Sequence, residues 1–419
     1  MNQSAKKAGR LRSLRALAGL LAAAVTITGC GSAAQAVPSL TIYSSFPLQG
    51  AQRTISEGTL KGMRLALAQA HDHAGRFKIV LVSLDDSTAE AGAWDPGQTA
   101  LNARQAAADR SAVAYIGEYN SGASAVSIPI LNEAGVPQVS PGNTAVGLTT
   151  SGVGAEPGEP GKYYPTGRRT FLRIIPRNTI QGAAIARLMR DRPCQRIVIL
   201  NDKELYGRTL AANVVASARA LGLRVLLNRG FNTRAPNYHQ LVARLAALRA
   251  DCALFSGTTP NNAVQLFRDL AAGLPHATLF GPNGVAESDF VDPAQGGLPP
   301  AAAVRTWITT PTLDEARYPP SAARDFYIPY RRAYGPLPPE PYAIYGYEAM
   351  RLVLNAIAQA GPHGYQRAAV LRQLMATHDR HSVLGTYSID PNGDTTLTDY
   401  GAYRIRNGQL TLDHVIHGQ

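Results

Sequence analysis

The chain has 419 residues, of which 45% are hydrophobic and 17% are charged, and its formal net charge at pH 7 is +12. A chain of this length suggests two domains. The basic residues are scattered, with isolated pairs at 168–169 and 331–332 in place of a clustered basic face. This composition argues against nucleic-acid binding.

The N-terminal residues have the pattern of an export signal. Basic residues precede an apolar run at 16–27, which is too short to span a bilayer as a mature helix. The run ends in Ile27, Thr28, Gly29 and Cys30, which resembles a bacterial lipobox. We therefore expect a lipoprotein signal peptide over residues 1–29 and a lipid anchor on Cys30. The alternative is an ordinary secretory signal cut near residue 34 or 36, and both versions predict export.

Strand-like and helix-like segments alternate in the rest of the chain, in two series separated by a Gly- and Pro-rich loop at 150–170. The first series predicts strands at 40–45, 78–84, 112–117 and 136–140, with helices at 56–71, 98–109 and 122–134. After a strand at 171–175, the second series predicts strands at 196–200, 224–227, 253–256 and 278–281, with helices at 179–191, 207–221, 238–250 and 260–272. The last part continues through 304–309 and then predicts helices at 322–334, 342–360 and 365–378, followed by short strands at 385–389 and 400–406.

Strands that alternate with helices of 10–15 residues are typical of parallel sheets covered on both faces. The sequence therefore predicts an α/β fold of two doubly wound parallel-sheet lobes joined by a three-segment hinge. We expect the hinge segments near 172–175, 302–306 and 383–386. These boundaries assign 38–172 and 306–383 to lobe 1, and 174–303 and 385–419 to lobe 2.

Two strand ends of the first series run into small hydroxyl and glycine residues, at 117–124 and at 139–144. Ser121 and Thr144 are separated by about one strand–helix–strand unit, and neighbouring parallel strands present their carboxyl ends at one crevice, where ligands bind. The helix that begins near Ser121 has free N–H groups suited to an anion. These residues predict a binding site for a small polar molecule.

Cys194 and Cys252 each stand just before a predicted strand of the second series. If these are the first and third strands of a doubly wound lobe, they are neighbours and both cysteines lie at the same edge. Export permits a disulfide there, and we expect Cys194 and Cys252 to form one. The alternative is two separate buried thiols.

The order of short motifs resembles the type I periplasmic binding proteins of the leucine/isoleucine/valine-binding kind, the receptor components of ABC importers. The resemblance covers residues 40 to about 400. Its pieces are FPLQG at 46–50, LDD at 84–86, IG at 116–117, IPI at 128–130, EAGVP at 133–137, VSPGNT at 139–144, ND at 201–202, YG at 206–207, SG at 256–257 and FGPNG at 280–284.

The resemblance implies roles for individual residues. Ser121 and Thr144 would bind the α-carboxylate and α-ammonium groups of an amino acid, the backbone at Gly142 would contribute, and Tyr206 would line the cleft from lobe 2. The chain departs from the family where Asn283 replaces a glutamate that pairs with the ammonium group. It departs again where Thr258 and Thr259 stand in place of aromatic residues.

Losing the glutamate matters because a desolvated ammonium group without a counter-ion is costly. Either Glu118, Asp202 or Glu204 substitutes for it, or the ligand has no ammonium group and is amide-, urea- or polyol-like or a carboxylate. Arg53, on the loop after the first strand, is a further candidate for a ligand carboxylate, and a solvated arginine is the alternative.

The sequence contains no nucleophile elbow, phosphate loop or dinucleotide fingerprint. Asp85, Asp86 and the histidines lack partners at metal-ligand spacing. We therefore expect no enzyme, no cofactor and no metal. The expected protein is a monomeric, extracytoplasmic, lipid-anchored receptor that delivers one small ligand to an ABC permease. The alternatives are a sensory protein of the same fold coupled to a signalling partner, and a hydrolase of an envelope substrate.

Overall fold

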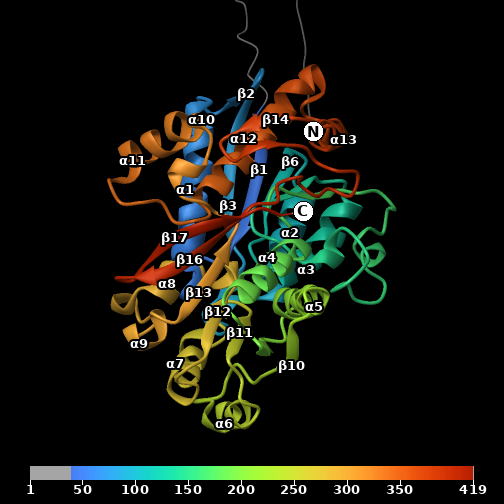
Figure 1. Ribbon diagram of the computed structural model, residues 1–419. Helices are drawn as coiled ribbons and strands as arrows, with labels where there is room; N and C mark the ends of the chain where they lie inside the picture. Colours follow the sequence, from blue (N-terminus) through green and yellow to red (C-terminus); the bar gives the residue numbers. More distant parts are fainter. Residues whose placement is uncertain (1–38, 419) are drawn as a thin grey trace, which may run out of the picture. The chain divides into compact units, whose positions relative to one another are not determined.

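A computed structural model describes residues 39–418, so the predicted signal peptide and Cys30 lie outside the described residues. The described residues belong to one compact unit. Two sheets organise this unit, and each is covered by helices on both faces (Figure 1). The predicted α/β architecture is confirmed.

The first sheet has six strands, all parallel except for the short β2 at one edge. Its helices α1 (Arg53–Gln69) and α12 (Ala343–Gln359) pack together on one face, and α2 (Pro96–Ala108) and α3 (Ser121–Glu133) pack on the other. Alternate residues of β1 feed the two cores, as the period of a strand requires. In order across the sheet, the strands are β2 (His73–Ala74), β3 (Phe77–Asp85), β1 (Ser39–Phe46), β6 (Ala112–Gly117), β7 (Gln138–Ser140) and β8 (Phe171–Arg173).

The second sheet has seven strands. The first five are parallel to one another, the sixth is antiparallel to the fifth, and the seventh is antiparallel to the sixth. Helices α4 (Asn178–Asp191) and α5 (Leu205–Ala220) cover one face, and α6 (His239–Ala247) and α7 (Ala263–Gly273) cover the other. In order across the sheet, the strands are β10 (Arg224–Gly230), β9 (Arg196–Asn201), β11 (Cys252–Ser256), β12 (Thr278–Gly281), β13 (Thr306–Thr310), β16 (Tyr400–Arg406) and β17 (Gln409–Ile416).

Cys194 and Cys252 form the expected disulfide, with their Cα atoms 5.6 Å apart. Cys252 begins β11, and β11 pairs in parallel with β9, just beyond Cys194. The prediction that these two strands are neighbours in the sheet is confirmed.

Shorter elements connect these layers. Among them, the 3-10 turn Gly161–Tyr163 interrupts the 150–170 segment, for which the sequence predicted no helix. The others are β4 (Ser87–Thr88), β5 (Ala93–Trp94), β14 (Arg380–Ser382), β15 (Gly385–Tyr387), α8 (Ser288–Val291), α9 (Pro300–Ala303), α10 (Pro320–Ala322), the π-helix Ala323–Tyr327, α11 (Ile328–Tyr334) and α13 (Arg367–Met375).

Two predicted lobe boundaries are wrong. Strand β13 belongs to lobe 2, because it pairs with β12 and β16, so the chain returns to lobe 1 after Thr310 and not near 302–306. Segment 385–389 belongs to lobe 1, since Tyr387 lies in that core and its hydroxyl donates to Glu348 of α12 (2.9 Å). The third crossing therefore lies between Ile389 and Tyr400.

A buried ion cluster ties two of the three crossings together. Arg173, fully buried at the end of β8, places its Nε 2.6 Å from Oδ1 of Asp394 in the third crossing. Arg177 Nη1 lies 2.8 Å from Asp394 Oδ2, and Thr149 donates to the same carboxylate. Burial raises the pKa of Asp394, but the two guanidinium groups outweigh burial and hold this pKa below its ordinary value.

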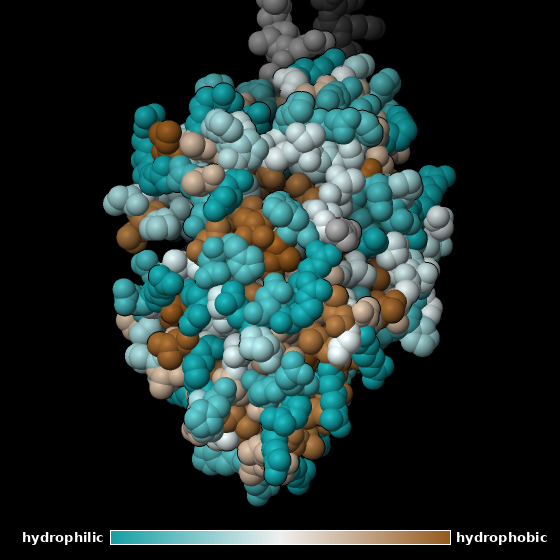
Figure 2. Space-filling model, in the orientation of Figure 1, coloured by the Kyte–Doolittle hydropathy of each residue, from teal (hydrophilic) through white to brown (hydrophobic). Residues whose placement is uncertain are grey.

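Apolar side chains are mostly buried in these cores. Figure 2 shows a face on which polar residues surround small, separated apolar patches. Among the described residues, no helix is both long and apolar enough to cross a bilayer.

Candidate functional site

One small space lies where loops of both lobes meet. Its empty volume, which includes space open to solvent, is about 260 Å³. The lining residues are Tyr119, Asn120, Ser121 and Gly142 from lobe 1, and Tyr206, Thr258, Asn283 and Gly284 from lobe 2.

Lobe 1 contributes the N-terminus of α3 and two loops at the ends of β6 and β7. Asn120 precedes the helix and makes no side-chain cap, and its Oδ1 is buried without a hydrogen-bond partner. Thr144 is fully buried, and its Oγ1 also has no partner. Ser121 Oγ accepts a hydrogen bond from the Ala145 N–H at 3.3 Å. Buried polar atoms without partners are uncommon in folded proteins, and here they gather beside an uncapped helix end.

Lobe 2 contributes a chain of polar side chains that reaches into lobe 1. The Tyr206 hydroxyl donates to Asn283 Oδ1, and Asn283 Nδ2 donates to the Tyr342 hydroxyl, both at 2.5 Å. Tyr342 directly precedes α12 of lobe 1 and packs edge-on against Tyr119, with ring centroids 5.3 Å apart. Asn283 therefore bridges the lobes at the position where the sequence departs from its family.

Asp202 holds the lobe 2 loop in place. Its carboxylate accepts hydrogen bonds from the Thr258 N–H (3.1 Å), the Asn261 side chain (2.8 Å) and the Glu204 N–H (3.0 Å). Burial raises the pKa of Asp202 to about 7. Its oxygens are used within lobe 2, so Asp202 positions Thr258 and is not part of the lining.

The predicted site residues divide into those that line the space and those that do not. Ser121, Gly142, Tyr206, Thr258 and Asn283 line it. Thr144 and Thr259 are buried on the adjoining loops, and the Thr259 N–H donates to the Gly284 carbonyl at 3.1 Å. The Gly142 N–H donates to Ser140 Oγ at 3.1 Å.

Arg53 lies outside the lining. Its side chain is 64% exposed, and its Nε lies 2.7 Å from Glu57 on the next turn of α1. The structure thus agrees with the alternative that Arg53 is a solvated arginine.

The predicted substitutes for the missing glutamate also lie outside the lining. Glu118 is buried beside Asp86 and accepts a hydrogen bond from the Tyr115 hydroxyl at 2.8 Å. Glu204 is half-buried at the start of α5, where burial raises its pKa. Neither residue is among those that line the space.

Sequence reasoning missed Tyr119, Asn120, Gly284 and Tyr342. Tyr119, Asn120 and Gly284 are next to residues that the sequence analysis selected, so the polar residues at strand ends could have led to them as well. Tyr342 comes from a distant helix and had no local signal. Gly284 is required by close approach, because a Cβ there would lie 2.5 Å from the Gly257 carbonyl oxygen.

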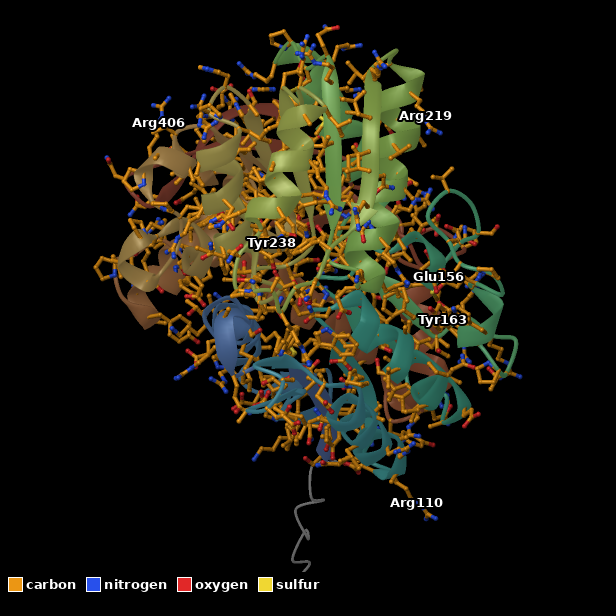
Figure 3. All side chains as sticks on the ribbon, turned by 90° about the horizontal axis from the view of Figure 1, so that it is seen from below. Arg110, Glu156, Tyr163, Arg219, Tyr238 and Arg406 are labelled. Atoms are coloured by element: carbon orange, nitrogen blue, oxygen red, sulfur yellow. A yellow bond between two sulfur atoms is a disulfide. The ribbon has the colours of Figure 1, made fainter. Side chains whose placement is uncertain are left out.

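The 150–170 loop reaches from lobe 1 to α5 of lobe 2. Glu156 forms an ion pair with Arg208 of α5, and the Val153 carbonyl accepts from Asn213 at 3.2 Å. Figure 3 shows Glu156 and Tyr163 on this loop beside α5. The loop thus adds contacts between the lobes outside the lining.

Comparison with known proteins identifies the architecture. The family model described as periplasmic binding protein matches residues 41–409. The chain belongs to the periplasmic binding protein family. This is a family of solute-binding proteins of the periplasm, not of enzymes.

Relatives of this family cover nearly all of the chain. An amino acid binding protein of Pseudomonas aeruginosa is 24% identical over 92% of this chain and 95% of its own length. A Leu/Ile/Val-binding protein homolog of Brucella abortus is 26% identical over 87% of this chain and 89% of its own length.

Solved structures share the fold. A leucine-binding protein of Thermotoga maritima has a TM-score of 0.77 at 21% identity, over 90% of this chain and 99% of its own. A solute-binding protein of an ABC transporter from R. palustris, in complex with benzoate, has a TM-score of 0.74 at 18% identity, over 91% of this chain and 97% of its own.

Within the described residues, no group of three or more His, Cys, Asp or Glu side chains is arranged to hold a metal ion.

Proposed function

We propose that this chain is the extracytoplasmic receptor of an ABC importer, and that it closes its lobes around one small polar ligand. The ligand classes that suit the site are a branched-chain or other amino acid, or an amide- or urea-like compound. One observation carries the proposal: residues of both lobes enclose a space whose lining includes the unpartnered Oδ1 of Asn120, and the unpartnered Oγ1 of Thr144 is buried on an adjoining loop.

The polar atoms of lobe 1 suit a carboxylate or carbonyl group of the ligand. The first turn of α3 offers backbone N–H groups, and its dipole favours negative charge there. Thr144 Oγ1 adds a hydroxyl donor that no protein group uses. Ligand binding to these atoms and to Tyr206 or Thr258 is possible together only when the lobes are closed. The ligand therefore shifts the population toward the closed form.

The membrane partners follow from the same proposal. The closed form docks on the permease, and the lipid on Cys30 keeps the receptor near the membrane. Stable anchoring takes more than one acyl chain. The names of the relatives, which include amino acid binding and Leu/Ile/Val-binding proteins, support this assignment.

The first experiment is thermal melting of the purified protein with leucine, isoleucine, valine, small amides, urea and benzoate. A ligand at about 100 times its Kd adds ~2.7 kcal/mol to the free energy of unfolding, which is a measurable rise in Tm. If no compound raises Tm, the receptor proposal loses its support. Uptake of a labelled hit by cells that lack the gene then tests coupling to a permease, since intact uptake contradicts an importer role.

Thr144→Val tests the site directly. The valine has the same shape, and the hydroxyl it removes has no partner in the empty protein, so Tm of the empty protein should not fall. Ligand affinity should fall roughly 10-fold if the hydroxyl contacts a charged ligand group. Thr411→Val on the edge strand β17 is the control, and it should leave affinity unchanged. Unchanged affinity in Thr144→Val would remove Thr144 from the site.

A further inference from the structure

Glu287 is a buried carboxylate that no ion pair among residues 39–418 neutralises. It is 2% exposed, and neither of its oxygens has a hydrogen-bond partner. Burial raises its pKa well above the usual range, the Thr259 hydroxyl lowers this pKa, and the carboxylates of Asp289 and Glu340 raise it further. No ion pair among the described residues includes Glu287. An unpaired buried carboxylate is costly, so its retention calls for an explanation.

Glu287 lies beside the space between the lobes. It follows the 3-10 turn Asn283–Val285, whose Asn283 and Gly284 line that space. The Glu287 carboxylate is near enough to raise the pKa of both the Tyr119 and the Tyr342 hydroxyls, which burial already raises. These two tyrosines pack together on the lobe 1 side of the space.

Contacts between the lobes enclose Glu287 with other acidic groups. Ser288 of lobe 2 donates to Glu340 Oε1 of lobe 1 at 2.8 Å, and Thr54 of lobe 1 donates to Asp289 of lobe 2 at 3.4 Å. The second Glu340 oxygen is also buried without a partner. Lys61 lowers the pKa of Glu340 but does not act on Glu287. Glu287 therefore lies with two acidic neighbours, and no ion pair among the described residues compensates its own charge.

We propose that Glu287 binds a positively charged nitrogen of the ligand, so that the ligand is a small zwitterion with a protonated amine. This proposal rests on the proposed receptor function and specifies its ligand. The carboxylate end of the ligand lies at the first turn of α3 and Thr144, and the amine end lies at Glu287. Asn283 stands where the resembling family has a glutamate for the ammonium group. In this chain, Asn283 bridges the lobes through Tyr342, and Glu287, four residues later, supplies the negative charge.

The proposal also explains what opposes closure of the empty protein. Without a cation, closing the lobes desolvates Glu287 next to Asp289 and Glu340, which is unfavourable. A ligand amine removes this cost only in the closed form. Closure is therefore coupled to the charge of the ligand as well as to its shape.

The test compares matched ligands by isothermal titration calorimetry: leucine, isoleucine and valine against the same acids without the amine, such as 4-methylpentanoate for leucine. The wild type should bind an amine-bearing acid and bind its deaminated analogue about 100-fold more weakly. Glu287→Gln should lose about 100-fold in affinity for the amine-bearing ligand and little for the analogue. Glu133→Gln, an exposed glutamate at the end of α3, is the control and should bind as the wild type does.

Two results overturn the proposal: equal affinity of the wild type for amine and analogue, or unchanged amine binding by Glu287→Gln. Thermal melting of the empty proteins supplies a readout that needs no ligand. Glu287→Gln should melt above the wild type and above Glu133→Gln, because it removes an uncompensated buried carboxyl group. A lower Tm for Glu287→Gln would show that the carboxylate has a partner in the protein, and would also overturn the proposal. If no ligand binds the wild type, the receptor function fails, whereas the melting result still decides the state of Glu287.

Discussion

Two buried carboxyl groups, Asp86 and Glu118, lie together behind the lobe 1 loops. The Tyr115 hydroxyl donates to Glu118, and both Asp86 oxygens lack partners. Burial is the largest influence on the pKa of both groups. It raises the pKa of Glu118 to about 7. For Asp86, burial and the charge of the nearby Glu118 together raise the pKa well above its ordinary value. The pair therefore holds at least one proton in the folded protein at a pH where the unfolded chain has released it.

This proton makes stability depend on pH. Between about pH 4.5 and pH 7 the folded state binds more protons than the unfolded state, so the free energy of unfolding falls as the pH rises. Tm of the wild type should decrease over this window, and the double variant Asp86→Asn with Glu118→Gln should show a smaller decrease. Differential scanning calorimetry at several pH values measures it, with Glu133→Gln as the control. A double variant with the wild-type pH profile would contradict the shared proton.

At the scale of elements, local chemistry explains most of the boundaries. Helix α2 begins where Asp95 accepts from the Gln98 N–H (2.9 Å) and Pro96 occupies the first turn. The turn between β16 and β17 is Asn407–Gly408, both with positive φ, which is the preferred two-residue hairpin turn. This dipeptide was visible in the sequence, and it predicts β17, the edge strand that the strand pattern alone did not identify.

The disulfide ties the first and third strands of lobe 2 across 58 residues. In the chain-entropy description, closing a loop of this length stabilises the fold by about 4 kcal/mol. The double variant Cys194→Ser with Cys252→Ser should lose most of this in urea unfolding. Reductant should destabilise the wild type by a similar amount and leave the double variant unaffected. A wild type that unfolds identically with and without reductant would contradict the pairing.

At the scale of the whole molecule, the proposed closure makes the affinity for the ligand depend on contacts between the lobes. They include Asn283 with Tyr342 in the site, Ser288 with Glu340 at the acidic cluster, and Glu156 with Arg208 outside it. The Arg173–Asp394 ion pair joins two of the three crossings, so the proposed closure would leave these two segments together. Weakening one contact of the closed form should lower ligand affinity without changing either lobe.

Tyr342→Phe removes one such contact and keeps the ring against Tyr119. A hydrogen bond contributes about 1 kcal/mol, so ligand affinity should fall roughly fivefold. Small-angle X-ray scattering should show that the wild type becomes more compact with ligand, and that the variant needs more ligand for the same change. The exposed Tyr365→Phe is the control. Scattering that does not change with saturating ligand would contradict closure of the lobes.

The sequence by itself determined most of the longer strands and helices, their order in two series, and the strand ends near which Ser121, Thr144 and Tyr206 lie. These features depend on periodicity, turn residues and strand ends, which are local. Only the tertiary structure decided the membership of β13, because Thr306–Thr310 is a strand in either lobe until its partners β12 and β16 are known. Tyr342 and Glu287 were beyond sequence reasoning for the same reason. Their importance arises from burial and from neighbours on other segments of the chain, and a charge without a partner is recognised only when everything around it is in place.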